Sequence, residues 1–235
     1  PSSAVNKRAA KKGTVQDISI GGVLSVFTRA GQVNWVLAPF AHKAPKSHTK
    51  SFTNAIEEVF GKGLTRSAIA GYARTADGRK KLRECYRHFW EDHNLVSMSL
   101  YAGPRATPVI STMEMPFNLW KRPSPTLPSE IGWLATGDAL LERKGRFRAW
   151  SDFYSSYVER VGVLVLPHHG SWHSYNPLLA HIFPNLYACL AAAGPNQYGH
   201  PDSRTYQHMV RMRCLVKWHH VSEHPDSGFG YRANI

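Results

Sequence analysis

The feature that most constrains this chain is a short apolar run followed immediately by two histidines. Residues 161–166 are apolar and partly β-branched, and the run stops at Pro167. Runs of this length, bounded by Pro and Gly, are typical of a buried β-strand. His168 and His169 come directly after this strand, at its carboxyl end. Open α/β sheets place their functional groups at that end, so the sequence predicts chemistry on this loop.

Two more predicted strands end in polar groups of the same kind. Residues 131–135 lead into a turn that contains Asp138. Residues 186–190 lead into a loop that contains Asn196 and His200. A single Gly-Asp turn or a single His-His pair is common on protein surfaces and has little meaning alone. Three successive strands that end this way favour one shared sheet edge where these side chains meet.

The remaining segments alternate predicted strands and helices. Apolar residues at helical spacing predict two amphipathic helices, one capped by Ser51 and running through Phe60, the other over residues 80–90. The other predicted elements are a hairpin over residues 21–37, a short helical turn at 66–72, helices at 150–157 and 203–212, and closing strands at 214–218 and 229–233. This order of elements predicts the α/β class.

The three strand ends, taken in order, resemble the C-terminal half of the metallo-β-lactamase fold. The matching motifs are Gly-Asp at 137–138, His-His-Gly-Ser at 168–171 and Asn-x-x-Gly-His-Pro at 196–201, and the segment at 94–97 also fits. The similarity is greatest to the branch that contains DNA-uptake competence proteins and phosphorylcholine esterases, and it spans roughly residues 20–225. It implies an αββα sandwich.

The resemblance also implies a site with two divalent metal ions, Zn²⁺ or Mn²⁺. Asp138 matches the aspartate that bridges the two ions in the family, and His169 matches a terminal ligand of one of them. His168 and His200 match groups that face the substrate phosphate, which makes them the candidate catalytic residues. Paired metal ions activate water and stabilise an in-line displacement, which suits the hydrolysis of a phosphodiester.

Four further residues are candidates for binding the substrate. Ser171 and Asn196 belong to the motifs that carry the resemblance. Arg143 and Lys144 open a cluster in which an aromatic ring lies between cations. Such clusters occur in nucleic-acid-binding grooves, and a plain exposed turn explains this one equally well.

The chain departs from the family at the motif that supplies most of the metal ligands. The string His-x-His-x-Asp-His, or its variant with Asp in third place, should follow an early strand and is not found. The nearest string runs from His88 to His93 through Asp92, has Trp90 in third place and continues a predicted helix. We therefore expect this chain to supply mainly the C-terminal half of the fold. The N-terminal half, with the remaining ligands, would be an absent segment or a partner chain. It would cover a sheet face that costs too much to leave bare.

Length, net charge and cysteine content limit the domain size, the binding partners and the cellular compartment of this chain. The chain of 235 residues is long enough for one large domain or two small ones. We assign one domain to residues 14–235, after a basic arm or linker at 1–13 and with a proline-rich loop at 102–129. The net charge of +13 favours nucleic acid or a phosphorylated substrate; a basic surface without a partner is the alternative. Three scattered cysteines, and the lack of an apolar span or signal core, favour a cytoplasmic protein without membrane contact.

Two functions agree with these features. The first is a metal-dependent hydrolase of phosphodiesters, a nuclease or a nucleotide phosphodiesterase, that needs the N-terminal half for its full set of ligands. The second is a catalytically degenerate basic module that binds nucleic acid or a partner chain. The absent motif favours the second for this chain alone, whereas the residues at the three strand ends favour the first.

Overall fold

The structure is a computed structural model that describes residues 21–28, 31–87, 97–105, 131–194, 198–212 and 216–222. The predicted arm at 1–13, most of the proline-rich loop, Asn196 and the string from His88 to His93 lie outside these residues. The chain divides into two compact units. Residues 1–41 with 98–235 form one, here named the sheet unit, and residues 42–97 form the other, here named the helical unit.

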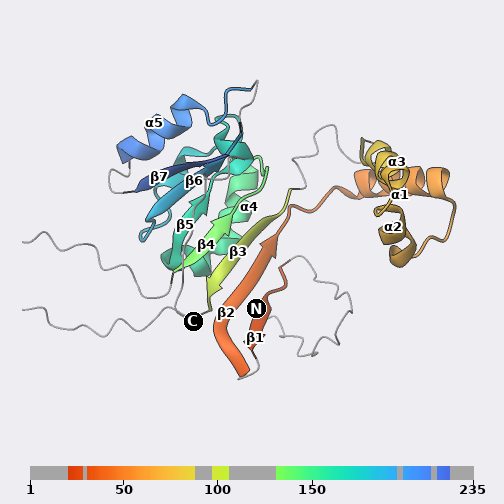
Figure 1. The fold of residues 1–235 in the computed structure, drawn as a ribbon, viewed down its shortest axis with the longest axis horizontal. Coiled ribbons are helices and arrows are strands. Elements are labelled where there is room, and N and C mark those ends of the chain that lie inside the picture. The colour runs from red at the N-terminus through yellow and green to blue at the C-terminus, as the bar shows by residue number, and fades with distance from the viewer. Residues whose placement is uncertain are drawn as a thin grey trace, which may run out of the picture. The chain divides into compact units, whose positions relative to one another are not determined.

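A seven-stranded mixed sheet is the frame of the sheet unit (Figure 1). Its strands lie side by side in chain order: β1 Leu24–Thr28, β2 Gly31–Phe40, β3 Ser99–Pro104, β4 Gly132–Ala135, β5 Val161–Val165, β6 Ala188–Ala192 and β7 Lys217–Val221. The neighbours from β1 to β4 are antiparallel, and those from β4 to β7 are parallel. The mixed α/β class is therefore confirmed, as is the N-terminal hairpin.

Parallel neighbours need crossover connections, and short helices fill them here. The connecting elements are α4 Lys144–Tyr154, η2 Ser155–Arg160, η3 Pro167–Gly170, η4 Pro177–Ala180 and α5 Ser203–Met212. None of the helices in the described part of the chain is long and apolar enough to cross a membrane.

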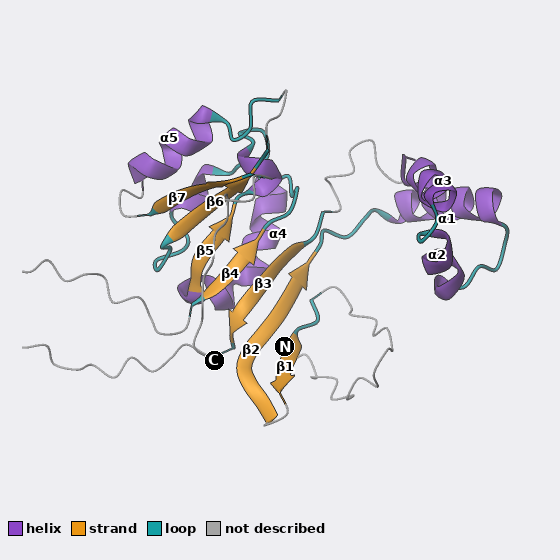
Figure 2. Ribbon diagram, in the orientation of Figure 1, coloured by secondary structure: helices purple, strands orange, loops and turns teal. Residues whose placement is uncertain are grey.

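The helices complete a buried core on one face of the sheet. Alternate strand residues such as Leu134, Leu164 and Cys189 share this face through the strand register and are fully buried. Figure 2 shows α4 alongside β4 and β5, and its Trp150 is fully buried in the same core. The Trp150 indole N–H also donates to the Ser99 hydroxyl at 3.0 Å, so a polar link ties α4 to β3.

The opposite face of the sheet keeps large apolar side chains partly exposed, and we name it the half-exposed face. Its members alternate with the core residues along the strands: Trp35, Leu37, Leu100, Trp133, Val165 and Leu190. None of these belongs to the buried cluster that the helices complete. Trp133 keeps 36% of its surface exposed, whereas Leu134 beside it keeps none. Ala102, Val163 and Ala188 of this face are nevertheless buried, so its cover is partial.

The helical unit consists of α1 Lys46–Phe60, α2 Arg66–Tyr72 and α3 Ala76–Arg87. Ala55, Ile56 and Cys85 are its buried centre, and partly buried apolar side chains pack around them. The prediction that Ser51 caps the first helix is wrong. The helix begins at Lys46, and the Ser51 hydroxyl lies inside it and donates to the Ser47 carbonyl at 3.2 Å.

Two helix and strand boundaries also differ from the sequence prediction. The fourth helix begins at Lys144 instead of residue 150, because its inward stripe of Phe147, Trp150 and Tyr154 starts among charged residues that hid the pattern. The last described strand is 217–221 instead of 214–218, since its pairing with β6 carries it through two histidines.

Replacing Trp150 by Ala should lower the free energy of unfolding by about 3–5 kcal/mol, because a buried ring and its hydrogen bond are lost. Trp133→Ala on the half-exposed face should cost about 1 kcal/mol or less. Urea unfolding followed by circular dichroism measures both. Equal losses at the two positions would show that both faces are covered equally well, against this description of the sheet.

Candidate functional site

The loop after β5 is a strained turn that carries both predicted histidines. His168 and His169 have positive φ angles of 46° and 58°, in the left-handed region that non-glycine residues rarely occupy. Such a conformation costs about 1–3 kcal/mol per residue and persists only where the surroundings enforce it. Here the His168 N–H donates to the Gly137 carbonyl, and the Ser171 N–H to the His168 carbonyl, both at 2.9 Å. Strain of this kind concentrates at functional sites.

The loop after β6 packs directly on this turn. Gly170 has a φ of +82°, and a Cβ placed on it would lie 3.0 Å from the Cβ of Pro201. The Asp202 N–H donates to the Gly170 carbonyl at 3.2 Å. A side chain at position 170 would therefore push apart the two loops, and with them the rings of His169 and His200.

Three imidazoles consequently gather at the carboxyl ends of β5 and β6. The ring centroids of His168 and His169 lie 5.8 Å apart. His200 lies 5.5 Å from His168 and 6.5 Å from His169. The exposed ring of Tyr198 stacks 6.1 Å from His200. The sequence prediction that His168, His169 and His200 meet at one sheet edge is confirmed.

The turn that carries Asp138 lies against the same loop. Thr136 holds it to β5, since its N–H and its hydroxyl donate to the Val165 carbonyl at 3.4 and 2.8 Å. The bond from His168 to Gly137 adds a second link between the two loops. Asp138 itself is half-buried. We name the three histidines and the Asp138 turn the histidine edge.

The hydrogen bond of His169 determines which ring nitrogen carries its proton. Its Nδ1 lies at hydrogen-bonding distance from the Ala192 carbonyl, which can only accept. Nδ1 therefore carries the hydrogen, and Nε2 of the neutral ring presents a lone pair. Metal-binding histidines usually have such a partner on the other ring nitrogen, which orients the ring. His168 has a similar but longer contact, from Nδ1 to the buried Ser174 hydroxyl at 3.3 Å.

The surroundings of His200 favour its neutral form. Burial lowers the pKa of His200, and the neighbouring His168 and His169 lower it further, against a smaller opposing effect of Asp202. A positive charge on the His200 ring would be repelled by any positive charge on His168 or His169. His200 is thus held in its neutral form at neutral pH.

The predicted substrate-binding residues differ in their exposure, and one of them lies outside the described residues. Ser171 is buried, with 3% of its surface exposed. Arg143 and Lys144 are exposed at the start of α4, and the backbone carbonyl of Arg143 caps that helix by accepting from Arg146 and Phe147. Asn196 lies outside the described residues. No group of three or more His, Cys, Asp and Glu among the described residues could hold a metal ion.

One histidine was missed at the same sheet edge. His220 lies in β7, and its Nε2 is 2.6 Å from the Ala193 carbonyl. Ala193 directly follows Ala192, the partner of His169. Only the register of a fourth parallel strand reveals this proximity, because the sequence around His220 carries no motif.

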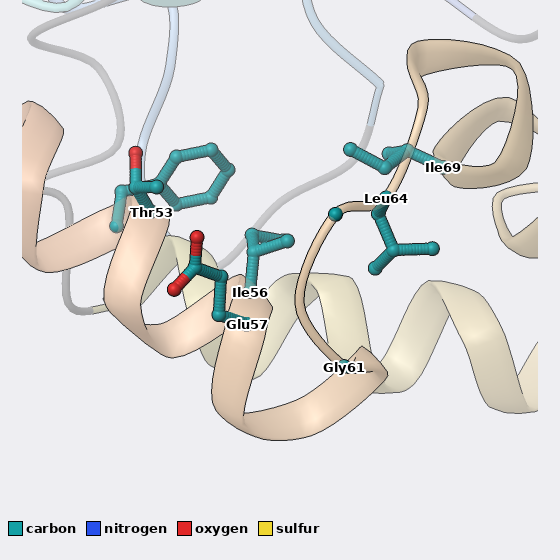
Figure 3. Close-up of a pocket in the computed structure, with 8 residues that line it drawn as sticks. Thr53, Ile56, Glu57, Gly61, Leu64 and Ile69 are labelled. Carbon is teal, nitrogen blue, oxygen red and sulfur yellow. The ribbon is translucent and has the colours of Figure 1, made fainter.

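A hollow in the helical unit does not have this chemistry. It measures about 220 Å³ and is lined by Phe52, Thr53, Ile56, Glu57, Gly61, Gly63, Leu64 and Ile69 (Figure 3). Its lining is largely apolar, with Glu57 as the titratable group. It shares no residue with the histidine edge.

No family model, no curated protein and no solved structure matches this chain. What the histidine edge does must therefore be inferred from its own geometry.

The tautomer of His169 can be observed directly. Long-range ¹H–¹⁵N NMR spectra of the uniformly labelled protein, recorded at a pH well above the usual imidazole pKa, should show a protonated Nδ1 and an unprotonated Nε2 for His169, the less common tautomer of a free imidazole. His169→Gln identifies the signal. A His169 ring protonated at Nε2 would contradict the hydrogen bond to Ala192.

Proposed function

We propose that the histidine edge is part of the active site of a metal-dependent phosphodiesterase related to the metallo-β-lactamase fold. The observation that carries this proposal is the convergence of three imidazoles, on a strained turn, with the Asp138 loop. Structural histidines have no need of two adjacent left-handed residues, whereas a site that must aim side chains at a substrate can use them.

The three imidazoles suit different tasks. His168 and His200 can donate hydrogen bonds to phosphoryl oxygens. Burial beside the other imidazoles keeps the pKa of His200 below its usual value, so that its neutral ring can accept a proton. In its neutral form His169 presents an Nε2 lone pair, because the Ala192 carbonyl accepts the Nδ1 hydrogen. This division supports roles of His168 and His200 toward the substrate and of His169 as a ligand.

The donors support only part of a metal site. An imidazole Nε2 and the Asp138 carboxylate are ligands that Zn²⁺ and Mn²⁺ accept. When bound, such ions supply an activated water for attack at phosphorus. The described residues hold too few donors to complete a site, so we derive no catalytic step through a metal. Further ligands would come from residues outside the described ranges or from another polypeptide.

The half-exposed face supports the proposal that a second layer completes the fold. A sheet packed on helices on one side, with Trp133 partly exposed on the other, is what half of an αββα sandwich would present. A contiguous apolar patch on a sheet face is the kind of surface that another layer covers. We therefore propose that the N-terminal half of the fold packs on this face and brings the remaining ligands.

The incomplete donor set also favours a second function. A chain that holds no complete metal site within its described residues would act as a basic module that binds nucleic acid or a partner. Metal-dependent hydrolysis by the protein with both halves present distinguishes the two functions.

The test is hydrolysis of bis(p-nitrophenyl) phosphate with Mn²⁺ or Zn²⁺ by the protein with both halves present. Asp138→Ala and His169→Ala should abolish turnover and metal binding, because each removes a ligand. His168→Ala should keep the metal but lower turnover by about two orders of magnitude, since it removes ~3 kcal/mol of charge stabilisation on the phosphoryl oxygens. The control is His181→Ala. His181 is exposed and directly follows η4, so this variant should leave turnover and metal binding unchanged.

Metal loss in His168→Ala with retention in His169→Ala would reverse the two assignments. Wild-type turnover that persists in Asp138→Ala would contradict the proposed site.

A further inference from the structure

The helical unit has the construction of a helix-turn-helix. Helix α2 and helix α3 are joined by residues 73–75 alone. The Thr75 hydroxyl donates to the Tyr72 carbonyl at 3.1 Å and accepts from the Gly78 N–H at 3.0 Å, so it ends one helix and caps the next. Two helices joined by a turn of three or four residues, after a first longer helix, are the arrangement in which the second helix of the pair contacts DNA.

A glycine keeps this turn tight. Gly78 is buried, and a Cβ placed on it would lie 2.1 Å from the Tyr72 carbonyl oxygen and 2.7 Å from the Thr75 hydroxyl. Any other residue would force α2 and α3 apart. The close approach of the two helices is thus built into the sequence and does not depend on flexible side chains.

The outward side of α3 is a stripe of cations. Lys80, Arg83 and Arg87 lie at i, i+3 and i+7 and are exposed, opposite the inward Leu82 and Cys85. Within the described residues these three cations form no salt bridge with a carboxylate. The salt bridge of this helix joins Lys81 to Asp77 at 3.0 Å. The stripe therefore has no structural task in the described part of the unit.

The charge of the whole unit agrees with this stripe. Residues 42–97 contain eleven Lys and Arg against six Asp and Glu, a net charge of +5 out of the +13 of the chain. A field of this sign concentrated on a small unit attracts polyanions.

The structure favours a duplex over the other polyanions. Single-stranded nucleic acids are bound on exposed aromatic faces. Tyr72 and Tyr86 are 40% and 43% exposed, but each packs in a tilted contact on a phenylalanine, Tyr72 on Phe60 at 4.6 Å and Tyr86 on Phe52 at 5.0 Å. A helix that binds a membrane surface needs an exposed apolar face, and the apolar face of α3 is packed in the unit. A rigid helix of 12 residues with basic side chains outward fits the major groove of DNA.

We propose that the helical unit binds double-stranded DNA through α3, with Lys80, Arg83 and Arg87 against the phosphates and the groove. This activity goes beyond the proposed hydrolysis and does not depend on it, since none of the three cations belongs to the histidine edge.

The experiment measures binding of a short fluorescein-labelled duplex of mixed sequence to the full chain by fluorescence anisotropy. The triple variant Lys80→Gln/Arg83→Gln/Arg87→Gln should bind at least about tenfold more weakly, and its slope of log K against log salt should be shallower by about one per cation removed. A control variant removes three exposed cations of the sheet unit instead: Arg148→Gln/Arg211→Gln/Lys217→Gln. It should keep nearly wild-type affinity.

A variant with the opposite sign guards against misfolding as the cause. Glu84 is exposed between Lys80 and Arg87 on the same helix, so Glu84→Gln should tighten binding, which a damaged fold could not do. Circular dichroism should show unchanged helix content in all variants.

Equal weakening in the triple variant and the control, or no binding of the duplex, would overturn the proposal. So would tighter binding of single-stranded DNA or RNA, or binding of anionic phosphatidylserine vesicles that depends on the same three cations. Hydrolysis of bis(p-nitrophenyl) phosphate by the triple variant, with the other half of the fold present, keeps the two proposals apart. Lost duplex binding with intact hydrolysis supports this one independently, whereas failed hydrolysis with intact duplex binding affects only the proposed function.

Discussion

The parallel pairing of β4 with β5 and of β5 with β6 is the constraint on which the rest of this structure depends. Parallel neighbours place their carboxyl ends at one edge of the sheet, so residues separated by tens of positions in the chain become neighbours there. Thr136 ties the first of these ends to the second through the Val165 carbonyl. The histidine edge follows from this pairing, because no local sequence brings its members together.

The packing on the sheet explains why the edge can hold strain. One face is filled by buried side chains, with Trp150 and Tyr154 of α4 hydrogen-bonded to β3 and β2. A well-packed core resists small displacements, and this resistance can hold His168 and His169 in unfavourable backbone conformations. The other face is covered less completely within the described residues: Val163 is buried there, whereas Trp133 stays partly exposed. The rigid face and the half-exposed face therefore have different roles, the first to position the site and the second to receive another layer.

The sequence could predict what depends on local pattern. The strands around the three motifs, the helix over 203–212 and the meeting of His168, His169 and His200 follow from apolar runs, their stops and the order of the elements. What it could not predict depends on tertiary contacts. His220 reaches the edge through strand register, and the tautomer of His169 follows from a carbonyl 23 residues away. The helical unit was predicted as separate helices, since nothing local marks residues 42–97 as a compact unit.

A crystal structure of the protein grown with Mn²⁺, with anomalous data collected near the manganese edge, tests the central claim most directly. The account predicts an anomalous peak at the histidine edge, within about 2.0–2.2 Å of both the Asp138 carboxylate and Nε2 of His169. His168 and His200 should face the same space without touching that ion. A structure in which the Asp138 carboxylate and the His169 ring lie more than about 10 Å apart would contradict the account, because packed strands cannot rearrange enough to close that gap.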